Sequence, residues 1–335
     1  MKKLIALLLV LALLSGLTAC GVVLPTLPDA TGGKTPDTTA AKDTEPAETK
    51  APTPQTDAPT TQPVPDTQPA PDTQPAQTSE PVPETPDFQE LLAFDNDDCA
   101  MKILGVEEDE FWGFQLIAQV ENKTEDMNLR FSVDTASVNG VCYDPYFSAS
   151  VAAGKKANED ISFSDEALND LLGAFTDIEL TVRVYDADDW SADDLAVETF
   201  HVYPYGQDKA AAYVRDPQPD DVVLVDNDDY SVIVTGYDPE GFWGYTVNLY
   251  LVNKSDLTLG FTADDVSVNG FMCEPYWGSV IDPGKVAFVG MDWSTSAFEE
   301  TGISEVEEIE FLLRVYNYDD FWGDDFYAET VTLHP

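Results

Sequence analysis

Two segments of the chain alternate between apolar and polar residues. In "GFQLIAQVEN", residues 113–122, the inward positions of such a pattern are Phe114, Leu116, Ala118 and Val120. "IELTVRVYD", residues 178–186, alternates in the same way. A period of two places successive side chains on opposite faces of a strand, and one apolar face is typical of antiparallel strands that cover a core. Both segments are therefore predicted to be half-buried strands.

The pattern returns later in the chain at a nearly constant spacing. Asp95 and Asp226, which open two "DNDD" blocks, lie 131 positions apart, and so do Trp112 and Trp243 of two "FWG" triplets. The strand pattern recurs at Tyr245, Val247, Leu249 and Leu251, then at Ile309, Phe311, Leu313 and Val315. The offset slips by one residue only between strand-like segments. We therefore expect two copies of one domain, each close to the usual domain size.

Turn signals separate the expected strands. Asn139-Gly140 and Asn269-Gly270 supply the positive φ angles of a tight hairpin. Only "DEALNDLL", residues 165–172, has the pattern of a short helix. About seven short strands per copy predict an all-β chain with two tandem immunoglobulin-like antiparallel β-sandwich domains. The cysteine pair and core tryptophan of antibody domains are absent from the pattern.

The N-terminal residues predict export and anchoring. Lys2 and Lys3 precede an apolar run over residues 4–14, which is too short to span a bilayer and has the length of a signal-peptide core. "LTAC" follows and ends at Cys20, and it resembles the bacterial lipoprotein signal, in which the cysteine is lipid-modified and becomes the new N-terminus. We therefore expect residues 1–19 to be a lipoprotein signal peptide. The rest would be held on the extracytoplasmic face of the cell membrane through an N-terminal lipid.

The residues that follow have a different composition. Residues 20–88 are rich in proline, threonine and aspartate and show no apolar period, so neither helix nor sheet is expected. An extended chain of this kind reaches on the order of 200 Å at most. We expect a disordered stalk, although a leader with no required length fits as well. The first repeat is then predicted at residues 89–204, an inter-domain linker at 205–220, and the second repeat at 221–335.

A family resemblance rests on the order of these motifs. "DNDD", "FWG", an Asn-Lys turn, "VNG", a Gly-Lys turn and "RVY" follow one another in both copies. This order resembles the immunoglobulin-like extracellular domains of uncharacterised lipoproteins from Gram-positive gut bacteria. The resemblance implies a fold and a location at the cell surface, and it implies no activity.

Charge limits the partners. The chain carries 63 acidic and 16 basic residues, a formal net charge of −47, so it repels nucleic acid and nucleic acid is not an expected partner. If the acidic blocks meet at one end of each sandwich, their carboxylates could bind Ca²⁺, a hard cation that prefers oxygen ligands. The alternative is a set of solvated acidic turns, because "DNDDYSVIVTG" does not match an EF-hand loop. The calcium hypothesis concerns Asp95, Asp97, Asp98, Asp188, Asp189, Asp226, Asp228, Asp229, Asp319 and Asp320.

Aromatic turns are the second candidate site. Exposed aromatic side chains can stack on sugar rings or anchor a protein interface, whereas buried ones would close the ends of the sandwiches. Recurrence in both copies fits packing at least as well as binding, and packing is the favoured expectation. The ligand-contact candidates are Trp112, Trp190, Trp243, Trp277 and Trp322.

Catalytic chemistry is not predicted. The two histidines, His201 and His334, do not occupy matching positions, and the sequence contains no serine-nucleophile, zinc-protease or phosphate-loop motif. Cys99 and Cys142 occur only in the first copy, where a disulfide between them and free buried thiols are both open alternatives. The sequence predicts a non-enzymatic surface lipoprotein that binds a protein or glycan. The alternative is a structural spacer or envelope-associated lipoprotein without a dedicated ligand.

Overall fold

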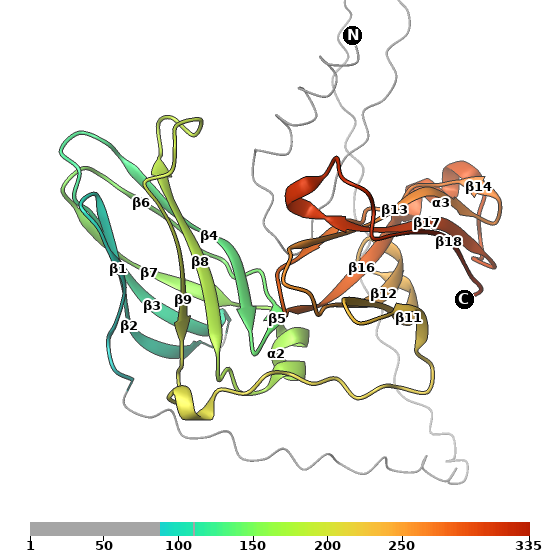
Figure 1. Ribbon diagram of the computed structural model, residues 1–335, viewed down its shortest axis with the longest axis horizontal. Helices are drawn as coiled ribbons and strands as arrows, with labels where there is room; N and C mark the ends of the chain where they lie inside the picture. Colours follow the sequence, from blue (N-terminus) through green and yellow to red (C-terminus); the bar gives the residue numbers. More distant parts are fainter. Residues whose placement is uncertain (1–87, 110) are drawn as a thin grey trace, which may run out of the picture. The chain divides into compact units, whose positions relative to one another are not determined.

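The computed structural model describes residues 88–109 and 111–335 (Figure 1). The predicted signal peptide, Cys20 and almost all of the predicted stalk lie outside these residues. The described part is built from antiparallel sheets with two short α-helices, which confirms the all-β prediction. In this part of the chain, none of the helices has both the length and the apolar character that a membrane span requires.

The first repeat contains nine strands and one α-helix. In chain order they are β1 (Leu91–Asp95), β2 (Cys99–Asp109), β3 (Gly113–Asn122), β4 (Leu129–Val138), β5 (Val141–Cys142), β6 (Ser148–Val151), β7 (Lys156–Phe163), α2 (Glu166–Leu172), β8 (Ile178–Asp186) and β9 (Ala196–Val202). One sheet has the order β1-β2-β3-β7, and in the other β4 pairs with β5, β6 and β8, and β8 with β9.

The second repeat has the same strand pairing. Its elements are β10 (Val222–Asp226), β11 (Tyr230–Gly241), β12 (Gly244–Asn253), β13 (Leu259–Val268), β14 (Phe271–Met272), β15 (Ser279–Ile281), β16 (Val286–Ser294), α3 (Thr295–Thr301), β17 (Ile309–Asn317), η2 (Tyr318–Asp320) and β18 (Tyr327–Leu333). The strands β10-β11-β12-β16 correspond to β1-β2-β3-β7, and β13 pairs with β14, β15 and β17 as β4 does with its partners. The internal repeat seen in the sequence is therefore a repeat of topology.

The strand count differs from the expected seven per copy. Each repeat has nine strands, because β5 and β14 are two-residue strands after the hairpin turns and because β6 and β15 are short additional strands on β4 and β13. The second repeat also contains α3, which the sequence did not predict. The Ser294 side chain caps α3 by accepting a hydrogen bond from the Ala297 amide. The helix has one large apolar side chain, Phe298, and therefore shows no helical period in the sequence.

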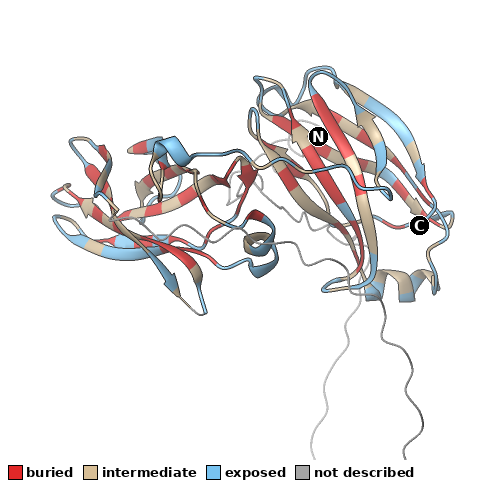
Figure 2. Cartoon of the chain, turned by 90° about the horizontal axis from the view of Figure 1, so that it is seen from below, coloured by how far each residue is buried: buried red, intermediate tan, exposed pale blue. Residues whose placement is uncertain are grey.

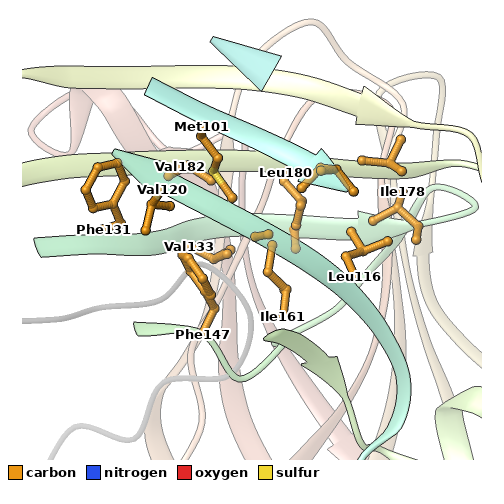
Figure 3. Close-up of a cluster of buried hydrophobic side chains, with 14 of the residues drawn as sticks. Met101, Leu116, Val120, Phe131, Val133, Phe147, Ile161, Ile178, Leu180 and Val182 are labelled. Carbon is orange, nitrogen blue, oxygen red and sulfur yellow. The ribbon is translucent and has the colours of Figure 1, made fainter. Parts of the chain in front are cut away.

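The inward positions predicted from alternation form the cores. Leu116, Ala118 and Val120 of β3 are fully buried, as are Ile178 and Leu180 of β8, and side chains from both sheets share one cluster (Figure 3). The second repeat has its own cluster with the corresponding residues of β12 and β17. Figure 2 shows buried positions along the strands and exposed positions at the turns.

The hairpin turns have the geometry that their sequence predicts. Asn139 and Gly140 have φ angles of 53° and 81°, and Asn269 and Gly270 have φ angles of 51° and 79°. Two successive positive φ angles match the twist of the flanking strands. The turn prediction is confirmed in both repeats.

The segment between the repeats contains a short 3-10 helix, η1 (Gln207–Lys209), and an ordered ion pair. The Arg215 guanidinium donates two hydrogen bonds to the Asp221 carboxylate, at 2.7 and 2.6 Å. Both repeats belong to one compact unit, in which Val141 of β5 and Val286 of β16 form a single parallel pair.

Candidate functional site

Each repeat has two different ends. At the first end of the first repeat, the "FWG" triplet lies next to α2, since a Cβ on Gly113 would meet the Phe163 carbonyl and the Asn169 amide. At the second end, the Asn96 side chain donates a hydrogen bond of 3.5 Å to the Leu195 carbonyl, which joins the "DNDD" turn to the loop before β9. We call the first the helix end and the second the acidic end.

The acidic blocks do meet the late loop at one end, but their carboxylates do not form a metal site. Among residues 88–109 and 111–335, no group of three or more His, Cys, Asp or Glu side chains is arranged to hold a metal ion. The acidic groups instead have local partners: Asp95 pairs with Lys123, and Asp226 pairs with Lys254 at 2.6 Å. The expected convergence of aspartates is not found, so we do not propose a calcium site.

The asparagine of each "DNDD" block explains why the block occurs at the same place in both repeats. The Asn96 side-chain oxygen accepts hydrogen bonds from the amides of Asp98 and Cys99, at 2.9 and 2.8 Å. Asn227 accepts the same two bonds from Asp229 and Tyr230. Side-chain acceptors of this kind stabilise a tight turn. The block therefore builds a turn between two strands.

The remaining aspartates of the calcium hypothesis lie in exposed turns of the acidic end. Asp188 accepts a hydrogen bond of 2.9 Å from the Asn128 side chain. Asp189 accepts one of 2.7 Å from the Ser191 hydroxyl, and hydrogen bonds from Ser191 lower the pKa of this exposed carboxyl. The other members of the set are exposed at the turns and lack a shared centre. They are Asp97, Asp98, Asp228, Asp229, Asp319 and Asp320.

The "FWG" triplet of the first repeat carries aromatic rings into solvent. The Asp109 carboxylate accepts hydrogen bonds of 2.8 Å from the amides of both Phe111 and Trp112, and these bonds lower its pKa. Phe111 and Trp112 are 79% and 44% exposed. Tyr146 lies beside them, with its ring stacked on Trp112 at a centroid distance of 6.2 Å and an interplanar angle of 21°. Three exposed rings thus form one patch, with the tip backbone held by a carboxylate.

The second repeat displays the same residue types at the same place. Phe242 and Trp243 are exposed, Trp243 by 65%, and their rings pack edge to face at 4.9 Å as Phe111 and Trp112 do. Tyr276, the counterpart of Tyr146, is also exposed. Each tyrosine is held by two backbone hydrogen bonds to one residue of the neighbouring strand. Tyr146 pairs with Ser162, and Tyr276 pairs with Asp292. We call these two sets the aromatic tips: Phe111, Trp112 and Tyr146 in the first repeat, and Phe242, Trp243 and Tyr276 in the second.

The glycine of each triplet is required by close backbone packing. A Cβ on Gly113, at a φ of 69°, would lie 2.4 Å from the Phe163 carbonyl oxygen. A Cβ on Gly244, at a φ of 135°, would lie 2.3 Å from the Trp293 carbonyl oxygen. No side chain fits at such distances. The hairpin therefore sits tightly on the neighbouring strand and directs the preceding two aromatic residues outward.

Two further tryptophans are exposed at the acidic end. Trp190 is 58% exposed and Trp322 is 80% exposed. The two are not equivalent, because the position of Trp190 corresponds to Phe321, and Phe321 packs edge to face on Tyr316 at 5.4 Å. This end therefore differs between the repeats, whereas both aromatic tips expose a Phe-Trp pair and a tyrosine.

The expectation that the tryptophans close the sandwich ends is wrong for four of the five candidates. Trp112, Trp190, Trp243 and Trp322 are exposed, and only Trp277 is half-buried. The tryptophan that does pack in a core is Trp293, which donates a hydrogen bond of 2.8 Å from its indole nitrogen to the Cys273 carbonyl. Sequence reasoning also missed Phe111 and Phe242 as contact residues, although their place in the repeated triplet was a usable signal.

The cysteines do not form the disulfide considered from the sequence. Cys99, Cys142 and Cys273 are free and buried. Cys99 begins β2 at the acidic end, next to Asn96, whereas Cys142 pairs with Ser137 beside the hairpin turn at the other end of its sheet. The two thiols also pack in different core clusters. Burial raises the pKa of Cys99 to about 11, so the thiol stays protonated and unreactive at neutral pH.

The arginines on the strands before the acidic loops form ion pairs. Arg183 contacts Asp194 at 2.7 Å. Arg314 contacts both Asp325, at 2.8 Å, and Asp264, at 2.9 Å, and these carboxylates raise its pKa further. Both arginines therefore tie β8 and β17 to the loops that follow these strands.

Comparison with known proteins gives no assignment. No family model matches the sequence, and no curated protein matches it. Among solved structures, the crystal structure of a red sea bream transglutaminase matches at 10% sequence identity and a TM-score of 0.18. That match covers 74% of this chain and 30% of the transglutaminase chain, so this chain spans less than a third of that protein. A likeness this distant carries no argument about fold or activity.

Proposed function

We propose that this protein is a non-enzymatic surface lipoprotein whose two immunoglobulin-like β-sandwich domains bind a protein or glycan through the aromatic tips. The observation that carries the proposal is that both repeats expose a Phe-Trp pair and a tyrosine at the helix end. Large aromatic side chains cost free energy when they are left in water, and they are the residues most enriched at binding hot spots. Two similar tips on one chain would also let a multivalent partner bind both at once.

The membrane anchor and the stalk belong to the same proposal. The "LTAC" motif at Cys20 supports lipid attachment, and the proline-rich residues up to 88 support a spacer between the membrane and the domains. A spacer of this kind would carry the aromatic tips away from the envelope surface. The domain boundaries at residues 89–204 and 221–335 are part of this proposal.

A glycan array and a surface-protein array, probed with the purified whole chain in detergent, test the proposed binding. The double variant Trp112→Ala/Trp243→Ala removes one ring from each aromatic tip. We expect it to weaken binding to any array hit by about tenfold or more, the usual effect of losing a hot-spot tryptophan. The matched control is Trp190→Ala/Trp322→Ala, which removes two exposed tryptophans from the acidic end and should bind like the wild type.

The outcomes separate the proposal from its alternatives. Equal loss in both double variants would mean that binding follows total aromatic exposure and does not involve a site at the tips. Silence on both arrays would favour the structural spacer, in which the repeats extend reach and have no ligand of their own.

A further inference from the structure

The chain holds its own arginines with a recurring pair of residue types, an aromatic ring and a carboxylate. The guanidinium of Arg183 lies over the ring of Tyr185, 4.8 Å from the ring centroid, and contacts the Asp194 carboxylate at 2.7 Å. A guanidinium over an aromatic face gains cation–π attraction, and the carboxylate accepts its hydrogen bonds. The ring and the carboxylate therefore act together on one side chain.

Two further arginines are held in the same way. In both, the guanidinium lies over a tyrosine ring, at 5.4 and 5.8 Å from the centroid, and contacts an aspartate, at 2.6 and 2.8 Å. Three of the four arginines in residues 88–109 and 111–335 thus have this environment. The two further sets are Arg215 with Tyr250 and Asp221, and Arg314 with Tyr316 and Asp325.

The aromatic tips present a ring and a carboxylate without an arginine. In the first repeat, the two amide bonds of the tip both go to Oδ1 of Asp109, and Oδ2 has no hydrogen-bond partner among the residues that the structure describes. Trp112, whose amide makes one of these bonds, is 44% exposed. In the second repeat, Glu240 is exposed at the place of Asp109, three residues before the exposed Trp243. Each tip therefore offers an open indole and an acidic side chain to solvent.

The chain supplies no basic side chain of its own to this end. The segments that build the helix ends contain acidic residues and no lysine or arginine. Lys209, which follows the first repeat, contacts its neighbour Asp208 at 3.4 Å. Lys123 and Lys254 pair with aspartates at the acidic ends. The segments of the helix ends are residues 105–116, 139–147 and 161–178 in the first repeat, and 236–247, 269–278 and 290–310 in the second.

Charge and shape then select among possible ligand groups. The amide bonds lower the pKa of Asp109, so this carboxyl is ionised at neutral pH, and the net charge of −47 draws a cationic partner toward the chain. A neutral sugar could stack on the indole but would gain nothing from the carboxylate charge. A lysine ammonium has the charge but no plane to stack, whereas a guanidinium has both. Arginine is therefore the group that fits the tips best.

We propose that each aromatic tip binds an exposed arginine of a protein partner. The guanidinium stacks on the indole of Trp112 or Trp243, and the carboxylate of Asp109 or Glu240 accepts its hydrogen bonds. This inference rests on the binding function proposed above, and it selects a basic protein surface over a glycan as the ligand of the tips.

Isothermal titration of the whole chain in detergent with three capped hexapeptides tests the proposal. In the first peptide arginine alternates with glycine. The second carries lysine instead, which keeps the charge without the planar group, and the third carries citrulline, which keeps a planar group without the charge. We expect the arginine peptide to bind, the lysine peptide to bind about fivefold more weakly, and the citrulline peptide to show no binding at millimolar concentration.

A first pair of variants tests the role of the rings. Trp112→Ala/Trp243→Ala should weaken binding of the arginine peptide by about tenfold and remove its advantage over the lysine peptide. The matched control is Trp190→Ala/Trp322→Ala, which removes two exposed tryptophans from the acidic ends and should leave both affinities unchanged.

A second pair of variants separates the tips from the general attraction of an acidic chain. Asp109→Asn/Glu240→Gln removes two charges, while the Asn side-chain oxygen can still accept the amide bonds of the tip, and binding of the arginine peptide should fall about fivefold. Asp97→Asn/Asp228→Asn removes the same charge from exposed positions of the acidic ends and should bind like the wild type.

Several results would overturn the proposal. They are equal binding of the arginine and citrulline peptides, and equal losses in the tip variants and their matched controls. If the tip-dependent ligand on the arrays is a neutral glycan and the arginine peptide is indifferent to Trp112→Ala/Trp243→Ala, the binding function stands and the arginine assignment is wrong. If this double variant changes neither array binding nor peptide binding, both proposals are wrong.

Discussion

At the scale of single residues, one buried asparagine per repeat organises a turn. The Asn122 side-chain nitrogen donates hydrogen bonds of 2.8 Å to the carbonyls of Met127 and Val151, and its oxygen accepts from the amide and hydroxyl of Thr124. Asn253 makes the corresponding bonds in the second repeat. A side chain that satisfies four backbone and hydroxyl groups in a buried place links three segments at once.

Replacing this asparagine should be costly. Asn122→Ala removes all four of these hydrogen bonds at a buried position, and we expect the free energy of unfolding to fall by about 3 kcal/mol. Asn253→Ala should cost a similar amount, because its contacts are the same. Urea denaturation measures both.

The control is Asn158→Ala, which removes an exposed asparagine that contacts Gln119 at 3.1 Å. It should change stability by less than about 0.5 kcal/mol. A cost for Asn122→Ala no larger than that of this control would show that the turn is held by other contacts.

At the scale of elements, the hairpin between β2 and β3 depends on close packing at its glycine. Gly113 and Gly154 have nearly equal φ angles, 69° and 65°, but a Cβ on Gly154 would meet no atom within 4 Å. Comparing an alanine substitution at the two glycines therefore separates the cost of backbone strain from the cost of a steric clash. This conflict is the physical reason that the aromatic tip has one defined direction.

The two glycines should respond differently to the same change. Gly154→Ala carries only the cost of a positive φ, about 1 kcal/mol. Gly113→Ala adds a clash with the Phe163 carbonyl, and we expect a loss of about 3 kcal/mol or more in chemical denaturation. Equal losses would indicate that the hairpin can shift away from its neighbouring strand.

The segment before β10 gives a pH-dependent prediction. Arg215 lowers the pKa of the Asp221 carboxyl from its ordinary 3.8 to about 2. A carboxyl whose pKa is lower in the folded state stabilises the fold above pH 3.8, and this contribution is lost as the pH falls toward 2. Asp221→Asn should therefore cost about 2 kcal/mol at pH 7, and the difference from the wild type should vanish near pH 2.

Denaturation curves measured across this pH range test the sign. Asp208→Asn, at an exposed position of η1, should change stability little at any pH. A difference for Asp221→Asn that stays constant from pH 7 to pH 2 would contradict the role of the ion pair.

Elements that depend on local pattern could be predicted from the sequence. The alternation at residues 113–122 and 178–186 matches the bounds of β3 and β8, and the helix predicted over residues 165–172 is α2, which begins one residue later because Asp165 is its N-cap. The counterpart α3 was missed because its segment holds one large apolar side chain, Phe298, whereas the equally long α2 contains three leucines.

The candidate site was predicted only in part. The repeated "FWG" triplets located the aromatic tips, but periodicity does not report whether a turn residue points inward. The exposure of Trp112 follows from the contact between Gly113 and Phe163, a residue 50 positions later in the chain. The aspartates of the calcium hypothesis do not converge among the described residues, where Asp95 pairs with Lys123 and Asn96 bonds the amides of its own turn.

At the scale of the whole molecule, one unit is used twice with different ends. The pairing of β10–β18 reproduces that of β1–β9, and both repeats expose a Phe-Trp pair and a tyrosine, while their acidic ends differ. Two copies of one exposed surface on a single chain would let a multivalent partner bind with avidity.

The proposed anchor is tested at this scale. When the whole chain is expressed in a Gram-positive host with an alkyne-labelled fatty acid, the wild type should carry the label and partition with the membrane. Cys20→Ala should lose both the label and the membrane association, because the attached acyl chains supply the apolar area that binds the bilayer.

Cys142→Ala, which removes a buried thiol, should keep both the label and the membrane association. If the label persists in Cys20→Ala, the lipid is attached at another residue and the proposed anchor at Cys20 is wrong.

The display of the aromatic tips is the claim on which the proposed binding rests, and oxidative footprinting of tryptophan tests it most directly. Under brief oxidation of the folded chain, followed by peptide mass spectrometry, Trp112 and Trp243 should be oxidised quickly, whereas the fully buried Trp293 should be protected. If Trp112 and Trp243 are protected to the same degree as Trp293, the tips are not displayed and the account is contradicted.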